Sequence, residues 1–218
     1  MEIGIKAVVF DFGGVLVHQP NKEDISTIAE YFEIDTEELI SLYAEHRPEY
    51  DGGLIDQYQY WSRVAESVGK RCDAACADRL HAMDVEAWAS ENSNMVAWAG
   101  KLKTEGYRTA VLSNMPTPFI EPYHRRFPWL LDFDHRFYSG EIQASKPGPA
   151  IYLHCLTKLG LEGRQCVFID DNKENVTAAK KQGFYAFHFS GRKKLSEDIQ
   201  KELSNGQKIP SPFDTAAE

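Results

Sequence analysis

The order of apolar and polar positions predicts strands that alternate with helices over most of the chain. A nearly continuous apolar run covers residues 5–10 and leads to Gly13-Gly14, which is typical of a buried parallel strand that enters a tight loop. Strands that alternate with helices imply right-handed crossovers, so we predict an α/β fold with a three-layer, Rossmann-like core and a parallel sheet. The predicted strands are 5–10, 108–112, 166–169 and 184–189, and the predicted core helices are one that stops at Gly106, 149–159, 174–182 and 193–203.

The stretch between the first strand and residue 92 has helical periodicity only. Its predicted helices are 24–32, 36–46, 56–68 and 73–83, and residues 46–53 are expected to join two of them as a loop. We therefore predict an all-helical cap at 18–91, inserted after the first strand, with 1–17 and 92–218 as the core. Residues 205–218 are polar and contain proline, and we expect a flexible tail there.

Composition supports one core with an insert and excludes two classes of partner. The 218 residues are 43% hydrophobic, which is enough for a sizeable core. Acidic residues outnumber basic ones by 33 to 24, and the net charge of -9 is a poor match to nucleic acid. Apolar runs fall far below the roughly 20 residues of a membrane helix. No signal peptide is recognisable, so we expect a cytoplasmic protein with no membrane partner.

The four cysteines do not form a metal-binding pattern. Cys72 and Cys76 are four residues apart, whereas Cys155 and Cys166 lie far along the chain, and no second close pair exists. We therefore expect reduced structural thiols rather than a zinc site.

Polar residues follow the predicted strands at one edge of the sheet. In an open parallel sheet, ligands bind outside the carboxyl ends of the strands. Three carboxylates, a hydroxyl and an ammonium group are expected to meet there. The residues concerned are Asp11, Ser113, Asn114, Asp170 and Asp171 at strand ends, and Lys146 in a loop rich in proline and glycine.

This set of groups fits metal-assisted phosphoryl transfer. A carboxylate attacks phosphorus only when the repulsion between the two charges is screened, and Mg²⁺ prefers such hard oxygen ligands. Asp11 is then both nucleophile and metal ligand, and it forms an aspartyl phosphate that water hydrolyses. Ser113 and the backbone amide of Asn114 hold phosphate oxygens, and Lys146 offsets the charge of the transferring group.

Four segments of the chain resemble the motifs of the haloacid dehalogenase superfamily. They read VVFDFGGVLV, AVLSN, SGEIQASKPGPAIY and VFIDDNKENV, in that order, with the helical insert where this superfamily places its first type of cap. The resemblance implies Asp11 as nucleophile, Lys146 as charge-stabilising lysine and Asp171 as direct metal ligand. It also implies Ser113 as the phosphate-binding hydroxyl, Asp170 acting through a metal-coordinated water or the lysine, and Asn175 as support for these ligands.

One position departs from the phosphatases of this superfamily. They usually carry a second aspartate two residues after the nucleophile, which protonates the leaving group, and this chain has Gly13 there. A missing general acid typically costs a factor of about 10²–10⁴ in rate. The carbonyl of Gly13 can still bind the metal. The sequence resembles a subgroup that includes sugar 1-phosphate phosphatases and the phosphatase-like N-terminal domain of epoxide hydrolases. A good leaving group, or His18 as a substitute acid, would compensate for the missing aspartate.

These features predict a Mg²⁺-dependent phosphatase that acts on a small phosphorylated metabolite, with sugar phosphates as candidates. Arg47, in the predicted cap loop, is a candidate substrate contact. The alternatives are a 2-haloacid dehalogenase, which needs no metal and for which Asp170-Asp171 is a liability, and a catalytically weak binding or regulatory protein. The identity of the substrate and the oligomeric state cannot be read from the sequence.

Overall fold

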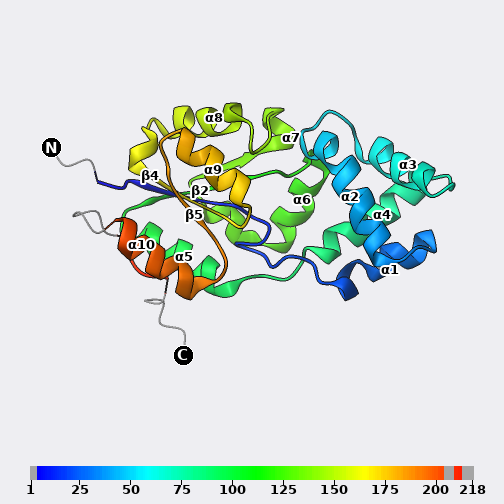
Figure 1. The fold of residues 1–218 in the computed structure, drawn as a ribbon, viewed down its shortest axis with the longest axis horizontal. Helices are drawn as coiled ribbons and strands as arrows, with labels where there is room; N and C mark the ends of the chain where they lie inside the picture. Colours follow the sequence, from blue (N-terminus) through cyan, green and yellow to red (C-terminus); the bar gives the residue numbers. More distant parts are fainter. Residues whose placement is uncertain (1–3, 204–208, 213–218) are drawn as a thin grey trace.

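The computed structural model describes residues 4–203 and 209–212, and its centre is a parallel sheet of five strands (Figure 1). The strand order is β3-β2-β1-β4-β5, so the first strand lies in the middle, where all four of its residues are buried. Ala7 on this central strand pairs with Arg108 on one side and Cys166 on the other. The strands are β1 (Ala7–Phe10), β2 (Arg108–Ser113), β3 (His135–Tyr138), β4 (Cys166–Asp170) and β5 (Tyr185–His188).

Helices cover both faces of this sheet and confirm the three-layer α/β core. Phe10 and Trp98 belong to the apolar core on one face, while Val9, Tyr152 and Phe168 belong to the core on the other. Alternate residues of a strand point to opposite faces, which explains why Val9 and Phe10 separate. The core helices are α5 (Ser93–Thr104), α6 (Thr117–Arg126), α7 (Ser139–Ile142), α8 (Pro149–Leu159), α9 (Lys173–Lys181) and α10 (Arg192–Glu202).

Four helices between β1 and α5 pack against one another at one end of the molecule (Figure 1). They are α1 (Lys22–Phe32), α2 (Thr36–Asp51), α3 (Gln57–Ser67) and α4 (Ala74–Ala87). Side-chain oxygens cap their starts: Asp35, for example, accepts a hydrogen bond from the amide of Glu38 at 2.7 Å. The rings of Phe32 on α1 and Trp61 on α3 stack with their centroids 6.3 Å apart. We propose that these helices form the cap expected at 18–91.

The structure contains α6 and α7, which are not among the predicted core helices, and it also differs from the predicted elements at α2 and β3. Helix α2 continues to Asp51, so most of the loop expected at 46–53 is helical despite Pro48. The ion pair between Arg47 and Asp51, at 2.6 Å, and the buried ring of Tyr50 hold its last turn together. Strand β3 was missed because it lies at the edge of the sheet, and its first two residues are only partly buried.

Two further expectations concern the cysteines and the end of the chain. The expectation of reduced thiols is wrong for Cys72 and Cys76, which form a disulfide. Their Cα atoms lie 5.3 Å apart because Cys72 precedes α4 in non-helical backbone. Cys155 and Cys166 are free and buried. Most of the tail expected at 205–218 lies outside the described residues. Its described part, 209–212, contacts the core, where Trp98 donates a hydrogen bond to the carbonyl of Pro210 at 3.0 Å. Among the described helices, none has the length and apolar character needed to span a membrane.

Candidate active site

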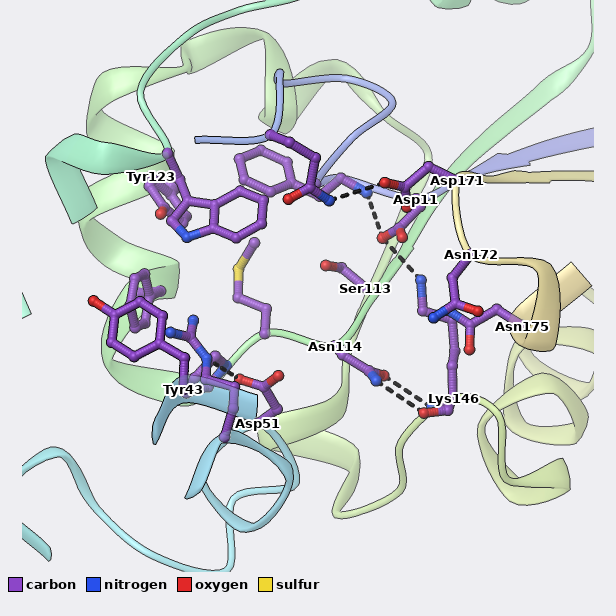
Figure 2. A pocket seen from close by; sticks show the side chains of 18 of the residues that line it. Asp11, Tyr43, Asp51, Ser113, Asn114, Tyr123, Lys146, Asp171, Asn172 and Asn175 are labelled. Atoms are coloured by element: carbon purple, nitrogen blue, oxygen red, sulfur yellow. Dashed lines mark hydrogen bonds and ion pairs between the residues drawn. The ribbon is translucent and has the colours of Figure 1, made fainter. Parts of the chain in front are cut away.

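The carboxyl ends of β1, β2 and β4 bring the predicted acidic residues together. Asp11 directly follows β1, Ser113 ends β2 and Asp170 ends β4, and these three strands are neighbours in the sheet. Carboxylate oxygens of Asp11, Asp170 and Asp171 all lie within 4.8 Å of one another. Figure 2 shows Ser113 beside Asp11 at this edge, with Lys146 on the opposite side of the carboxylate.

Lys146 reaches this cluster from the loop before α8. Its Nζ lies 2.8 Å from Asp11 Oδ1 and 2.7 Å from Asp170 Oδ2, and the side chain is buried. The side chain of Asn114 holds the lysine's main chain, because Nδ2 donates to the Lys146 carbonyl at 2.9 Å and Oδ1 accepts from the Lys146 amide at 2.8 Å. The side chain of Asn114 therefore positions the lysine, a role that sequence reasoning missed.

Asp170 and Asp171 have different surroundings. Asp170 is fully buried and accepts hydrogen bonds from the amide of Asn172 at 2.8 Å and from Asn175 Nδ2 at 3.1 Å. Asp171 is only partly buried and accepts from Gln19 Nε2 at 2.9 Å. The carboxylate of Asp171 is thus the more accessible of the two. Gln19 carries no sequence signal that would have singled it out.

The cluster holds more negative than positive charge. Burial, and then the charge of Asp170, raise the pKa of Asp11 well above its usual value, although Lys146 acts in the opposite direction. Burial also raises the pKa of Asp171, despite its hydrogen bond from Gln19. Burial alone would lower the pKa of Lys146, but the charges of Asp11 and Asp170 raise it. Three hard oxygen donors with one lysine between them fit a divalent cation such as Mg²⁺.

The two glycines after Asp11 are packed against other parts of the site. A Cβ on Gly13 would lie 2.8 Å from Cζ3 of Trp88, and one on Gly14, whose φ is +74°, would overlap the carboxylate of Asp171. Trp88 follows α4 and is only partly buried, whereas Trp61 and Trp98 are fully buried. The side chain of Trp88 also packs against the apolar core. Its ring occupies the space beside position 13.

A cavity of about 540 Å³ lies between the strand ends and the helices of the proposed cap. His18 is exposed and is not one of the residues that line this cavity, so the structure gives no support to it as a substitute acid. The core side of the lining includes Asp11, Gly13, Ser113, Asn114, Lys146, Asp171 and Asn175, and the cap side includes Tyr43, Ala44, Arg47, Asp51 and Trp88.

Arg47 lines the cavity, as its predicted role requires, but its charge is already paired. Its Nε lies 2.6 Å from Asp51 Oδ1, its Nη1 lies 2.9 Å from Asp84 Oδ2, and the guanidinium lies over the ring of Phe119 at 5.1 Å. Burial raises the pKa of Asp51 to about 6, although Arg47 lowers it. Asp51 was missed in the sequence because the segment around it was expected to be a loop, in which the pairing with Arg47 would not arise.

Curated relatives of this chain include phosphatases. A sesquiterpene phosphatase from Aspergillus oryzae is 24% identical over 193 residues, covering 85% of this chain and 90% of the relative. Phosphoglycolate phosphatase from Yersinia pseudotuberculosis is 24% identical over 186 residues, covering 82% of this chain and 78% of the relative.

Solved structures share the fold at low identity. A haloacid dehalogenase family enzyme from Bacteroides thetaiotaomicron, as an aspartate-to-alanine mutant in complex with magnesium and inorganic phosphate, superimposes with a TM-score of 0.70 at 21% identity and covers 85% of this chain and 94% of its own. The L-2-haloacid dehalogenase from Xanthobacter autotrophicus superimposes with a TM-score of 0.64 at 21% identity, covering 96% and 86%. The fold is thus shared by a dehalogenase and by an enzyme solved in complex with magnesium and inorganic phosphate.

The match to a protein family covers most of the chain and all four motifs at the strand ends. The family model of the haloacid dehalogenase-like hydrolases matches residues 5–183, which include Asp11, Ser113, Lys146 and the Asp170-Asp171 pair. The chain therefore belongs to the haloacid dehalogenase-like hydrolases.

Proposed function

We propose that this protein is a Mg²⁺-dependent phosphatase that hydrolyses a small phosphate monoester through an aspartyl-phosphate intermediate. The observation that carries the proposal is the convergence of Asp11, Asp170 and Asp171 within 4.8 Å, with Lys146 in contact with two of them. The phosphatase names of the two relatives support the same reaction.

In this proposal Asp11 is the nucleophile. The amide of Phe12 donates to its Oδ1 at 2.7 Å and Lys146 lies 2.8 Å from the same oxygen, so we assign the attack to Oδ2. The Oδ2–phosphorus bond forms as the bond from phosphorus to the leaving oxygen breaks, and the leaving oxygen takes its proton from water because Gly13 supplies no acid. Water then attacks the phosphorus of the aspartyl phosphate, which releases phosphate and restores the carboxylate.

The other residues of the site bind and balance charge. Ser113 and the backbone amide of Asn114 would hold phosphate oxygens, and Lys146 would offset the charge of the transferring group. Asp11, Asp171 and the carbonyl of Gly13 would hold Mg²⁺, with Asp170 acting through a bridging water or through Lys146. When bound, the cation screens the repulsion between the carboxylate of Asp11 and the phosphate.

Two alternatives are less well supported by the cavity. A 2-haloacid carries a carboxylate, and among the described lining residues the only cations are Arg47 and Lys146, both already paired with carboxylates. A dehalogenase would also carry the acidic cluster with no metal to neutralise it. A catalytically weak binding protein would explain Gly13, but it would not require an intact pair of Asp11 and Lys146.

Hydrolysis of p-nitrophenyl phosphate, with and without Mg²⁺, tests the proposal. Its leaving group needs little protonation, so Gly13 does not limit the reaction. We expect Mg²⁺-dependent release that falls at least about 10³-fold in the Asp11→Asn variant, with circular dichroism of that variant as the control for folding. No release with any divalent metal would refute the phosphatase. Halide release from 2-chloropropionate without metal would establish the dehalogenase instead.

A further inference from the structure

We infer that the substrate is a phosphate monoester whose organic group is a hydrocarbon or aromatic group with no second anion. This inference rests on the proposed function and specifies its substrate class.

The lining across from the phosphate-binding groups is rich in aromatic rings, and Arg47 and Asp51 are its charged members. Figure 2 shows Tyr43 and Tyr123 across the cavity from Asp11, with Ser113 between the two sides. A substrate held by its phosphate at Asp11 therefore directs its organic group at rings, and aromatic walls bind apolar groups by contact area rather than by hydrogen bonds. The apolar and aromatic residues of the whole cavity lining are Tyr43, Trp88, Met115, Pro116, Phe119 and Tyr123.

The charges in this wall disfavour a second anion on the substrate. Arg47 is the cation on the cap side among the described lining residues, and it pairs with Asp51 at 2.6 Å and Asp84 at 2.9 Å. With both carboxylates ionised, the group of three has a net charge of −1. A carboxylate on the substrate that approached Arg47 would be repelled by both of these partners.

Two of the polar side chains that could bind sugar hydroxyls are engaged within the protein, whereas the buried hydroxyl of Tyr43 accepts and donates no hydrogen bond among the described residues. Gln19 Nε2 donates to Asp171, and the side chain of Asn114 makes two hydrogen bonds with the backbone of Lys146. A sugar would lose its hydrogen bonds to water on entering and would recover few of them against rings, which is unfavourable. The sugar phosphates expected from the sequence are therefore disfavoured as a class.

The volume of the cavity agrees with a substrate larger than two carbons. About 540 Å³ lies within the range of sites for drug-sized ligands. A two-carbon phosphate would leave most of the apolar wall in contact with water, whereas a hydrocarbon group of six or more carbons would cover it.

Three primary alkyl phosphates with closely similar leaving oxygens separate the substrate classes. We expect kcat/KM for hexyl phosphate to exceed that for glucose 6-phosphate and for 2-phosphoglycolate by at least about tenfold, because each buried methylene improves binding by about fourfold. Equal or better turnover of either polar substrate would overturn the inference. Turnover of p-nitrophenyl phosphate in the same preparation shows whether the proposed phosphatase activity is present, and its absence would overturn both proposals.

A charge added to the wall provides the matched test. Ala44 lines the cavity from α2 and is exposed, so Ala44→Arg introduces an unpaired cation with little effect on packing. We expect this variant to lose at least about fivefold in kcat/KM for hexyl phosphate and to gain as much for 2-phosphoglycolate. Ala75→Arg, at an exposed position on α4 that does not line the cavity, should change neither. Identical selectivity in the two variants would show that the organic group of the substrate does not lie beside Ala44, and it would refute the inference.

Discussion

Gly13 and Trp88 form a pair whose contact accounts for the unusual residue after the nucleophile. Because a Cβ at position 13 would lie 2.8 Å from the ring of Trp88, an aspartate cannot be added there while the ring keeps its place. We expect Gly13→Asp alone to lower the free energy of unfolding by about 1–3 kcal/mol through overpacking. In the Trp88→Ala background the same aspartate should cost less and, as a general acid, raise kcat for hexyl phosphate at least about tenfold.

Urea denaturation of the wild type, both single variants and the double variant measures this coupling. An interaction free energy of at least about 1 kcal/mol between positions 13 and 88 is expected for residues in direct contact. Additive effects would show that the ring moves aside freely, and the aspartate would then be absent for a reason other than space.

Individual residues of the site were predictable when they stand at strand ends. Asp11, Ser113 and Asp170 follow from the rule that the carboxyl ends of parallel strands share one edge. Gln19 and Asp51 were not predictable, because their side chains meet the site through the path of a loop and the packing of the cap. No periodicity in one sequence specifies which face of a cap helix lies over the core.

Among the elements, α2 carries most of the cap residues that line the cavity, and the turn after it contacts α7. The hydroxyl of Ser139 donates to the carbonyl of Asp51, and Gly53, with φ of +70°, would place a Cβ 2.6 Å from the carbonyl oxygen of Gly140. This turn therefore determines where α2, with Tyr43, Ala44 and Arg47, lies over the strand ends.

Substitution of Gly53 by alanine tests this contact, and Gly69 offers the matched control. Gly69 has φ of +71° and nothing within 4 Å of its Cβ position, so Gly69→Ala carries only the backbone cost of about 1–2 kcal/mol. Gly53→Ala should cost at least about 1 kcal/mol more and should raise KM for p-nitrophenyl phosphate several-fold. Equal stability and equal KM in the two variants would show that the turn does not position α2.

The sequence predicted well those helices and strands whose apolar residues follow the helical repeat or form one continuous buried run. Helix α8 has the predicted bounds of 149–159, and the buried strands β1 and β4 match to within two residues at their starts and one at their ends. The sequence analysis missed α6. Two further misses are β3, whose edge position leaves it without a continuous apolar run, and the last turn of α2, which contains Pro48. In both cases tertiary contacts, rather than local pattern, decide the structure.

For the molecule as a whole, the acidic cluster links cation binding to stability. Folding brings positions 11, 170 and 171 together from distant parts of the chain, so the unfolded state lacks the site and Mg²⁺ binds the folded state preferentially. At a Mg²⁺ concentration of 100 times Kd the stabilisation is about 2.7 kcal/mol. For a chain of this length that corresponds to a rise in Tm of about 5–10 °C.

Replacing one carboxylate of the cluster should reverse the order of stability of the variant and the wild type between EDTA and Mg²⁺. Asp171→Asn removes a carboxylate whose pKa is raised by burial, so in EDTA the variant should be at least as stable as the wild type, because repulsion from Asp11 and Asp170 is relieved. In Mg²⁺ it should be the less stable of the two, because one ligand is missing. Calorimetry of both proteins, at equal ionic strength maintained with NaCl, distinguishes specific binding from screening. An equal rise in Tm for both proteins would assign the effect to bulk charge, given the net charge of -9, rather than to this cluster.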